Sequence, residues 1–154
     1  MTKSKQKLLE LEKEGKYLFH GSPVADLKEL KPHQAYTVPK GEKDMVKDDE
    51  PSVVATPYLE IAIFRALTSK SRSSFSVSAT SVENVKIKFA ASEETIKAAK
   101  DKIGYVYVLN REGFIPRSGH TYCMEWRSLN SVKPLWVFKV GYEDLLKNIE
   151  IIKQ

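Results

Sequence analysis

The chain has 154 residues, of which 25 are basic and 20 acidic, so its formal net charge is +5. This length is typical of one domain that buries its own core, which makes a disulfide framework or a structural metal unnecessary for folding. The single cysteine, Cys123, excludes an intramolecular disulfide and a thiolate metal cluster, and it favours a reducing, cytoplasmic compartment.

Charge and hydropathy also limit the partners that we expect. No apolar run approaches the roughly 20 residues of a transmembrane helix, and residues 1–7 lack the apolar core of a signal peptide. The positive charge suits a polyanion or a phosphorylated ligand but does not require one. We therefore predict one cytoplasmic domain over residues 1–154, with no membrane and no metal partner.

Residues 1–15 predict a lead-in helix. Over residues 4–14, Ser4 is suited to be the N-cap and Gly15 is suited to end the helix. Three leucines form an apolar edge among charges of both signs, a pattern typical of a helix that packs one side against a sheet.

The most informative stretch follows this helix. Residues 17–19 are aromatic or apolar and favour a short buried strand. The strand leads into His20, and Gly21, Ser22 and Pro23 are expected to end it. A titratable ring at the tip of a buried strand would lie beside glycine backbone that no side chain covers, which suits a small binding site. A histidine that merely caps the strand fits the same pattern.

Residues 24–51 predict a short helical turn and then a long polar loop. Leu27 and Leu30 are spaced for one helical turn, which a proline ends. Residues 33–51 are too polar for the core and too long for a simple turn. This loop is either a solvated excursion, which its charged run favours, or a lid in which Tyr36 covers a planar ligand.

The sheet is expected to resume over residues 53–56, and a buried helix is expected over residues 58–69. Pro57 is tolerated in the first turn of a helix, and the helix is apolar over most of its surface. Tyr58, at the helix start, is therefore expected to lie close to Thr56.

The C-terminal half predicts further strands and two helices. Ser92 is a suitable N-cap for a helix over residues 93–102. Residues 105–109 are apolar at every position, which indicates a central strand. A later strand carries one carboxylate, Glu125, among apolar neighbours, so this group has to point outward or be held by partners. The other expected elements are strands at 75–78, 85–89, 122–128 and 131–140, a short helix at 141–147 and a final strand or tail at 149–152.

Three of these pieces occur in a recognisable order: a strand ending in His20-Gly21, a strand ending in Ala55-Thr56 with a helix behind it, and a late strand with Glu125. This order resembles the ADP-ribosyltransferase fold, whose members bind NAD in the cleft of a split β-sheet. The resemblance implies an α+β fold with two small antiparallel-rich sheets around a cleft and a few flanking helices. We exclude a doubly wound parallel sheet, because no glycine-rich phosphate loop follows any strand.

The resemblance also implies a chemistry. Cleavage of the nicotinamide–ribose bond of NAD builds positive charge on the ribose carbon, as in glycoside hydrolysis. Glu125 would be the catalytic carboxylate that holds ribose hydroxyls and faces this charge. His20 would hydrogen-bond a ribose hydroxyl, and Gly21 would offer backbone groups to the nicotinamide amide. The implied cofactor is NAD, and this chemistry needs no metal.

The remaining NAD-site residues implied are Thr56 and Tyr58, which would line the nicotinamide pocket, and Tyr36. The chain departs from the family at three points. Tyr36 and Tyr58 are separated by a charged loop and do not form the tyrosine pair of the diphtheria-toxin branch. Its second motif is Ala-Thr-Pro rather than the Ser-Thr-Ser triplet of the arginine-modifying toxins. Cys123 stands two positions before Glu125, where arginine- and asparagine-modifying members carry a glutamate or glutamine. The acceptor of ADP-ribose, a protein or a nucleic acid, is therefore not indicated.

Two functions stay open. The first is a mono-ADP-ribosyltransferase or toxin component, in which His20 and Glu125 are expected to reach one cleft. The second is a non-catalytic relative of the fold that binds a protein or nucleic acid through a basic surface, with Glu125 turned away from that cleft. An RNA 2′-phosphotransferase, a related fold member, needs cleft arginines, and Arg65, Arg117 and Arg127 do not match its pattern.

Overall fold

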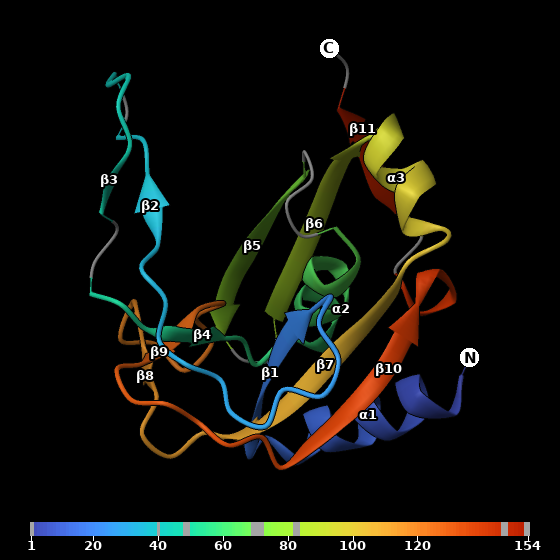
Figure 1. The fold of residues 1–154 in the computed structure, drawn as a ribbon, viewed down its shortest axis with the longest axis horizontal. Coiled ribbons are helices and arrows are strands. Elements are labelled where there is room, and N and C mark those ends of the chain that lie inside the picture. Colours follow the sequence, from blue (N-terminus) through green and yellow to red (C-terminus); the bar gives the residue numbers. More distant parts are fainter. Residues whose placement is uncertain are drawn as a thin grey trace.

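The computed structural model describes residues 2–39, 41–47, 50–68, 73–81, 84–145 and 148–152. Within these ranges helices and small sheets alternate along the chain, as Figure 1 shows. The helices are α1 (Lys3–Glu14), α2 (Leu59–Thr68), α3 (Glu93–Ala99) and the 3₁₀ helix η1 (Tyr142–Asp144). The strands are β1 (Tyr17–Ser22), β2 (Tyr36–Thr37), β3 (Val46–Lys47), β4 (Val53–Ala55), β5 (Ser73–Ser81), β6 (Asn84–Ser92), β7 (Ile103–Asn110), β8 (Ile115–Pro116), β9 (Trp126–Ser128), β10 (Trp136–Gly141) and β11 (Ile149–Ile152). The predicted α+β class is confirmed.

The first helix is capped by tertiary contacts that its own sequence does not reveal. Thr2, not Ser4, is the N-cap: its Oγ1 accepts a hydrogen bond of 3.1 Å from the Lys5 amide. The Thr2 hydroxyl in turn donates to Asp144 Oδ1 at 2.6 Å, near the other end of the chain. The prediction of Ser4 was therefore wrong, whereas Gly15 ends the helix at φ 68°, as expected.

The central sheet has the antiparallel order β1-β7-β10. Its middle strand β7 is completely buried from Val106 to Leu109, which confirms the prediction of a central strand. The expectation that the turn begins after His20 was wrong. His20, Gly21 and Ser22 continue β1 and pair with β7, so the histidine lies within the paired strand and not beyond its end.

Helix α2 lies between this sheet and the β5–β6 strands (Figure 1). It packs on β1 and β7, and the ring of Phe64 meets that of Phe89 on β6 at 4.5 Å. Seven of its apolar residues are at most 1% exposed, namely Leu59, Ile61, Ala62, Ile63, Phe64, Ala66 and Leu67. The helix is apolar over most of its surface and buried over most of it, as the sequence indicated, whereas Arg65 is exposed.

The described residues form four small sheets instead of the two that we expected. Strands β4, β9 and β8 form an antiparallel sheet in the order β4-β9-β8. Strand β6 pairs with β5 in the antiparallel sense and with β11 in the parallel sense. The predicted polar loop contains a two-stranded ribbon, β2–β3, which stands away from the rest of the fold in Figure 1.

Three local predictions differ from the structure. No helical turn forms between residues 24 and 32, because Leu30 makes an isolated bridge with Val132. Helix α3 begins after the predicted N-cap Ser92 but ends at Ala99 instead of residue 102. The short helix expected at 141–147 is the single turn η1, and its last two predicted residues lie outside the described ranges.

Candidate functional site

The site forms where the central sheet meets the β4-β9-β8 sheet. Phe19 on β1 and Thr56, just after β4, exchange both backbone hydrogen bonds, at 2.7 and 2.9 Å. The neighbouring His20 places its Nδ1 2.7 Å from the carbonyl oxygen of Val54. One backbone bridge and one side-chain bond thus hold the histidine of the first sheet against the first strand of the second.

The protonation of His20 follows from these contacts. Burial lowers its pKa from the ordinary 6.5, the bond with the Val54 carbonyl opposes this effect, and Arg65 and His33 lower the pKa further. The ring is therefore neutral near pH 7. Since a carbonyl only accepts, Nδ1 carries the proton and donates to Val54, and Nε2 is left as an acceptor. A ligand hydroxyl is the type of group that Nε2 is prepared to bind.

Gly21 lies directly under α2. A Cβ at this position would be 1.8 Å from the Ala62 carbonyl oxygen and 2.9 Å from the Ala66 amide nitrogen. Gly104 on β7 has a similar relation to Ala66. The helix therefore rests on glycine backbone, which explains Gly21 by packing and brings α2 close to the tip of β1.

A small pocket of about 70 Å³ opens between these elements. The residues that line it come from β1, from β4 and the residue after it, from α2, and from the segment before β9. They are Phe19, His20, Gly21, Val54, Ala55, Thr56, Ile61, Ala62, Arg65, Met124 and Glu125. Four residues predicted from the sequence, His20, Gly21, Thr56 and Glu125, are thus brought to one pocket.

A larger groove of about 510 Å³ continues on the other side of the histidine. His20 and Val54 line both spaces. The groove is formed by the segment after β1 and the start of β4, and it offers the polar groups of Lys31 and His33 beside apolar ones such as Leu30. An elongated ligand that passes His20 would therefore contact both spaces.

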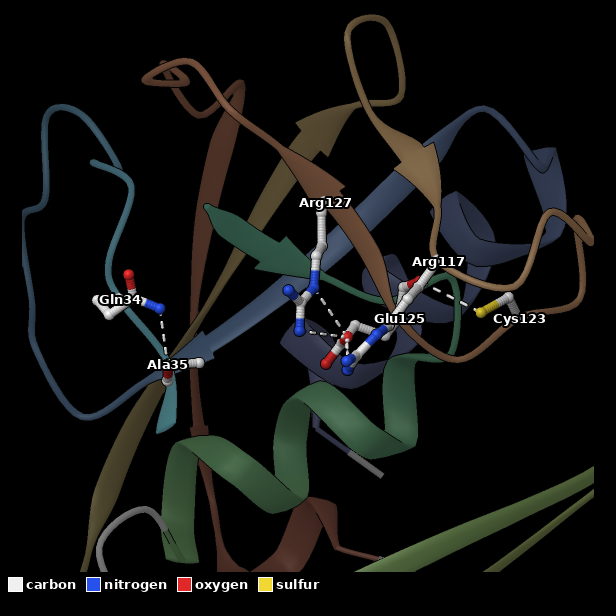
Figure 2. Close-up of polar contacts among 6 residues, drawn as sticks. All are labelled: Gln34, Ala35, Arg117, Cys123, Glu125 and Arg127. Atoms are coloured by element: carbon white, nitrogen blue, oxygen red, sulfur yellow. Dashed lines mark hydrogen bonds and ion pairs between the residues drawn. The ribbon is translucent and has the colours of Figure 1, made fainter. Parts of the chain in front are cut away.

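Glu125 is held in place by two arginines (Figure 2). Arg127 places Nε and Nη2 each 2.9 Å from Glu125 Oε2, and Arg117 places Nη1 2.9 Å from the same oxygen. The Arg117 amide also donates to the Glu125 carbonyl at 2.9 Å. The arrangement follows from strand register, since β9 pairs Arg127 with Val54 and pairs Trp126 with Ala55, which places Glu125 beside Thr56.

Cys123, two positions before Glu125, contacts backbone and not a neighbouring acid. Its Sγ donates to the Glu125 carbonyl at 3.3 Å, and Figure 2 shows this bond. Burial raises the pKa of the thiol, but hydrogen bonds with Ser118 and nearby backbone outweigh burial and lower it.

Figure 2 also shows Gln34, on the wall of the groove, donating to the Ala35 carbonyl at 2.9 Å.

The two predicted tyrosines are not among the described residues that line the pocket. Tyr58 donates its hydroxyl to the Tyr122 carbonyl, and its amide donates to Thr56 Oγ1 at 3.2 Å, so it supports the site from behind. Tyr36 is 54% exposed on the β2–β3 ribbon. Phe114, between β7 and β8, is buried in the core.

Sequence reasoning missed two cationic residues of the site. Arg65 lines the pocket from α2, where it and Glu60 are the only charged residues of the helix. That signal, a charge within an otherwise buried helix, was present in the sequence. Arg127 could also have been found, because side chains two positions apart in extended backbone lie on one face, which is how Arg127 reaches Glu125.

Comparisons of the chain with family models, with curated proteins and with solved structures each give no match. Within the described ranges, no group of three or more His, Cys, Asp or Glu side chains is arranged to hold a metal. None of the described helices is both long and apolar enough to cross a membrane.

Proposed function

We propose that the chain is an ADP-ribosyltransferase-like protein that binds NAD and transfers ADP-ribose to a protein or nucleic-acid acceptor. One observation carries this proposal: His20, Gly21, Thr56 and Glu125, which are far apart in sequence, line one pocket. The proposal includes a split-sheet fold of the ADP-ribosyltransferase type. The meeting of two three-stranded sheets at Phe19 and Thr56 supports it.

The size of the two spaces suits an elongated ligand. The inner pocket alone, about 70 Å³, is smaller than the roughly 300–1,000 Å³ of ordinary ligand sites. The groove beyond His20 adds a further space of about 510 Å³. A dinucleotide that places its reacting end by Glu125 and its other half in the groove would use both, and Lys31 would be near its phosphates.

The chemistry assigned to each residue follows from its surroundings. Nε2 of neutral His20 accepts a hydrogen bond from a ribose hydroxyl, because Nδ1 is occupied by Val54. Glu125 faces the ribose carbon on which positive charge develops, and it stabilises this charge more than it stabilises the uncharged substrate. Arg65 adds a cation at the rim, which suits the diphosphate of NAD.

Thermal unfolding with and without NAD tests the proposal. At an NAD concentration of 100 times the dissociation constant, binding should stabilise the fold by about 2.7 kcal/mol. His20→Ala should weaken binding because it deletes a ribose contact. His120→Ala is the matched control, since His120 stacks on Tyr122 and does not line either space. The absence of any shift at millimolar NAD or nicotinamide would contradict the proposal.

A second candidate function is a non-catalytic binding module with a basic surface. The observation that favours it is the double ion pair of Glu125, which resembles a structural contact as much as a catalytic one. Such a module would bind RNA or DNA with an affinity that falls steeply with salt. Titration of a fluorescent oligonucleotide at 50 and 200 mM salt tests this binding, and nicotinamide release from NAD separates the two functions, because only the enzyme cleaves NAD.

A further inference from the structure

The hydrogen bonds of Glu125 are distributed unevenly between its two oxygens. Three guanidinium nitrogens lie 2.9 Å from Oε2: Arg127 Nε and Arg117 Nη1 donate hydrogen bonds to it, and Arg127 Nη2 forms an ion pair with it. Within the described part of the chain, no hydrogen bond is made to Oε1. A carboxylate oxygen has about two lone-pair sites, so Oε2 has no capacity left for a ligand. Oε1 is the oxygen that remains for one.

The two arginines hold the carboxylate in different ways. The Arg127 side chain is only 10% exposed and lies on the strand that pairs with β4, so its guanidinium is fixed by packing. The Arg117 side chain is 45% exposed, but its backbone amide also donates to the Glu125 carbonyl. Glu125 is thus held by its main chain and by one of its two oxygens.

We infer that Arg127, assisted by Arg117, is a positioning residue that fixes Glu125 through Oε2 and directs Oε1 at the ligand. This inference rests on the proposed function. A glutamate just before a short strand would otherwise sample several rotamers, because its three side-chain torsions are free. A displacement of about 1 Å of a reacting group can cost about 100-fold in rate. If the arginines fix the carboxylate before NAD binds, this loss of rate is avoided, although the arginines add no contact to NAD.

The geometry explains why arginine is needed at position 127. A guanidinium presents Nε and Nη2 on one edge, and both reach Oε2. A lysine would keep the charge but would offer a single ammonium on a flexible stem. Arg127→Lys therefore separates positioning from simple charge neutralisation.

The experiment compares wild type, Arg127→Lys, Arg127→Gln and Arg117→Gln, with Arg111→Lys as the matched control. Arg111 lies over the ring of Trp126, the residue that follows Glu125 in the sequence. No contact joins Arg111 to the Glu125 carboxylate among the described residues. Nicotinamide release from NAD gives kcat and KM, and calorimetry gives the NAD dissociation constant. Arg127→Lys should lower kcat about 10- to 100-fold and change the dissociation constant less than about twofold. Arg127→Gln should lower kcat further, and Arg111→Lys should have no effect.

A second readout does not depend on turnover. In ¹⁵N NMR spectra, the Nε–H of Arg127 should exchange slowly with water in wild type and should lose this protection in Glu125→Gln. Rapid exchange in wild type would overturn the inference, whatever NAD does.

The kinetic outcomes test the positioning role of Arg127 and the proposed function separately. If wild type releases nicotinamide and Arg127→Lys behaves like Arg111→Lys, the positioning role is overturned and the proposed function stands. If wild type neither binds nor cleaves NAD, the proposed function fails and the positioning role fails with it. Binding without cleavage also overturns the role and supports a non-catalytic module. Protection of the Arg127 Nε–H in either case identifies a purely structural ion pair.

Discussion

Carboxylates meet cations in two regions of the molecule, and the two regions have different relations to solvent. At the junction of α1 and α2, Lys5 lies 2.6 Å from Glu60 and donates to the Asp144 carbonyl at 2.5 Å. Glu12 accepts a bond of 2.7 Å from the Leu59 amide and so caps α2. Beside the pocket, Glu125 is bound by two arginines at 2.9 Å. The contacts at the junction, at 2.5–2.7 Å, are shorter than those beside the pocket, at 2.9 Å, but all of them are within hydrogen-bond distance.

Access by a ligand is what distinguishes them. The side chains of Lys5 and Glu60 are 9% and 17% exposed, and neither lines the pocket or the groove. Glu125 is 26% exposed and forms part of the pocket wall. The first region can only stabilise the fold, whereas the second can also act on a ligand. The predictions below test this difference.

The largest effect is expected at the α1–α2 junction. Lys5→Met leaves the Glu60 carboxylate buried without its cation, which should lower the free energy of unfolding by about 3–5 kcal/mol. Urea denaturation measures this loss. The double variant Lys5→Met/Glu60→Leu should recover most of it, because the carboxylate that lost its cation is gone as well. A single-variant loss below about 1 kcal/mol would show that this pair is not the structural element described above.

Glu125→Gln should have the opposite profile. The substitution removes charge but little volume, so NAD turnover should fall about 100- to 1,000-fold. The free energy of unfolding should change by less than about 1 kcal/mol, because the pair is partly exposed and screened. Nicotinamide release and urea denaturation of one preparation measure both quantities. A large loss of stability with normal turnover would show that Glu125 stabilises the fold and takes no part in catalysis.

Gly21→Ala tests the contact that places α2 at the pocket. The new Cβ would meet the Ala62 backbone at 1.8 Å, so the free energy of unfolding should fall by about 1–3 kcal/mol. NAD affinity should fall too, because α2 must move. Gly141→Ala is the control, since its Cβ would meet only the mobile end of Glu143. Equal stability of the two variants in thermal unfolding would contradict the packing argument.

The smallest effect concerns pH, and its sign differs between the two regions. The lowered pKa of His20, caused mainly by burial, means that the unfolded chain binds a proton first as pH falls. Its contribution to stability is present above pH 6.5 and is lost as pH falls toward the folded pKa. Burial raises the pKa of Glu12, so its contribution is present below pH 4.5 and is lost as pH rises through the folded pKa.

Stability curves between pH 4 and 8 separate these two contributions. His20→Gln should flatten the curve just below pH 6.5, and Glu12→Gln should flatten it above pH 4.5. Each change is expected to be smaller than the effects of the substitutions described above. A wild-type curve whose slope below pH 6.5 survives in His20→Gln would show that another group titrates there.

Rules that consider only neighbouring residues predicted the features that neighbouring residues determine. Gly15 ends α1 and Ser92 caps α3 because these roles depend on neighbours within one helical turn. The apolar run of β7 predicted a central strand because burial on both faces needs such a run. Where a distant partner decides, the same rules failed: Thr2 became the N-cap through Asp144, and Leu30 bridged Val132 instead of forming a turn.

In the candidate site, the site residues were predicted but their interaction partners were not. His20, Gly21, Thr56 and Glu125 were identified from a resemblance in residue order, and the fold brings them to one pocket. Their partners were not identified, because the Val54 carbonyl that fixes His20 lies on another strand. The bond from Arg117 to Glu125 likewise depends on the pairing of β8 with β9, which residue types alone do not specify.

The junction at Phe19 and Thr56 has a mechanical consequence. Its two backbone hydrogen bonds hold the two sheets together at this point. Next to this bridge, His20 forms a side-chain hydrogen bond with Val54, so a second contact joins the two sheets at the same place. Because His20 on β1 and Val54 on β4 both line the pocket, this junction keeps two of its walls at a fixed spacing.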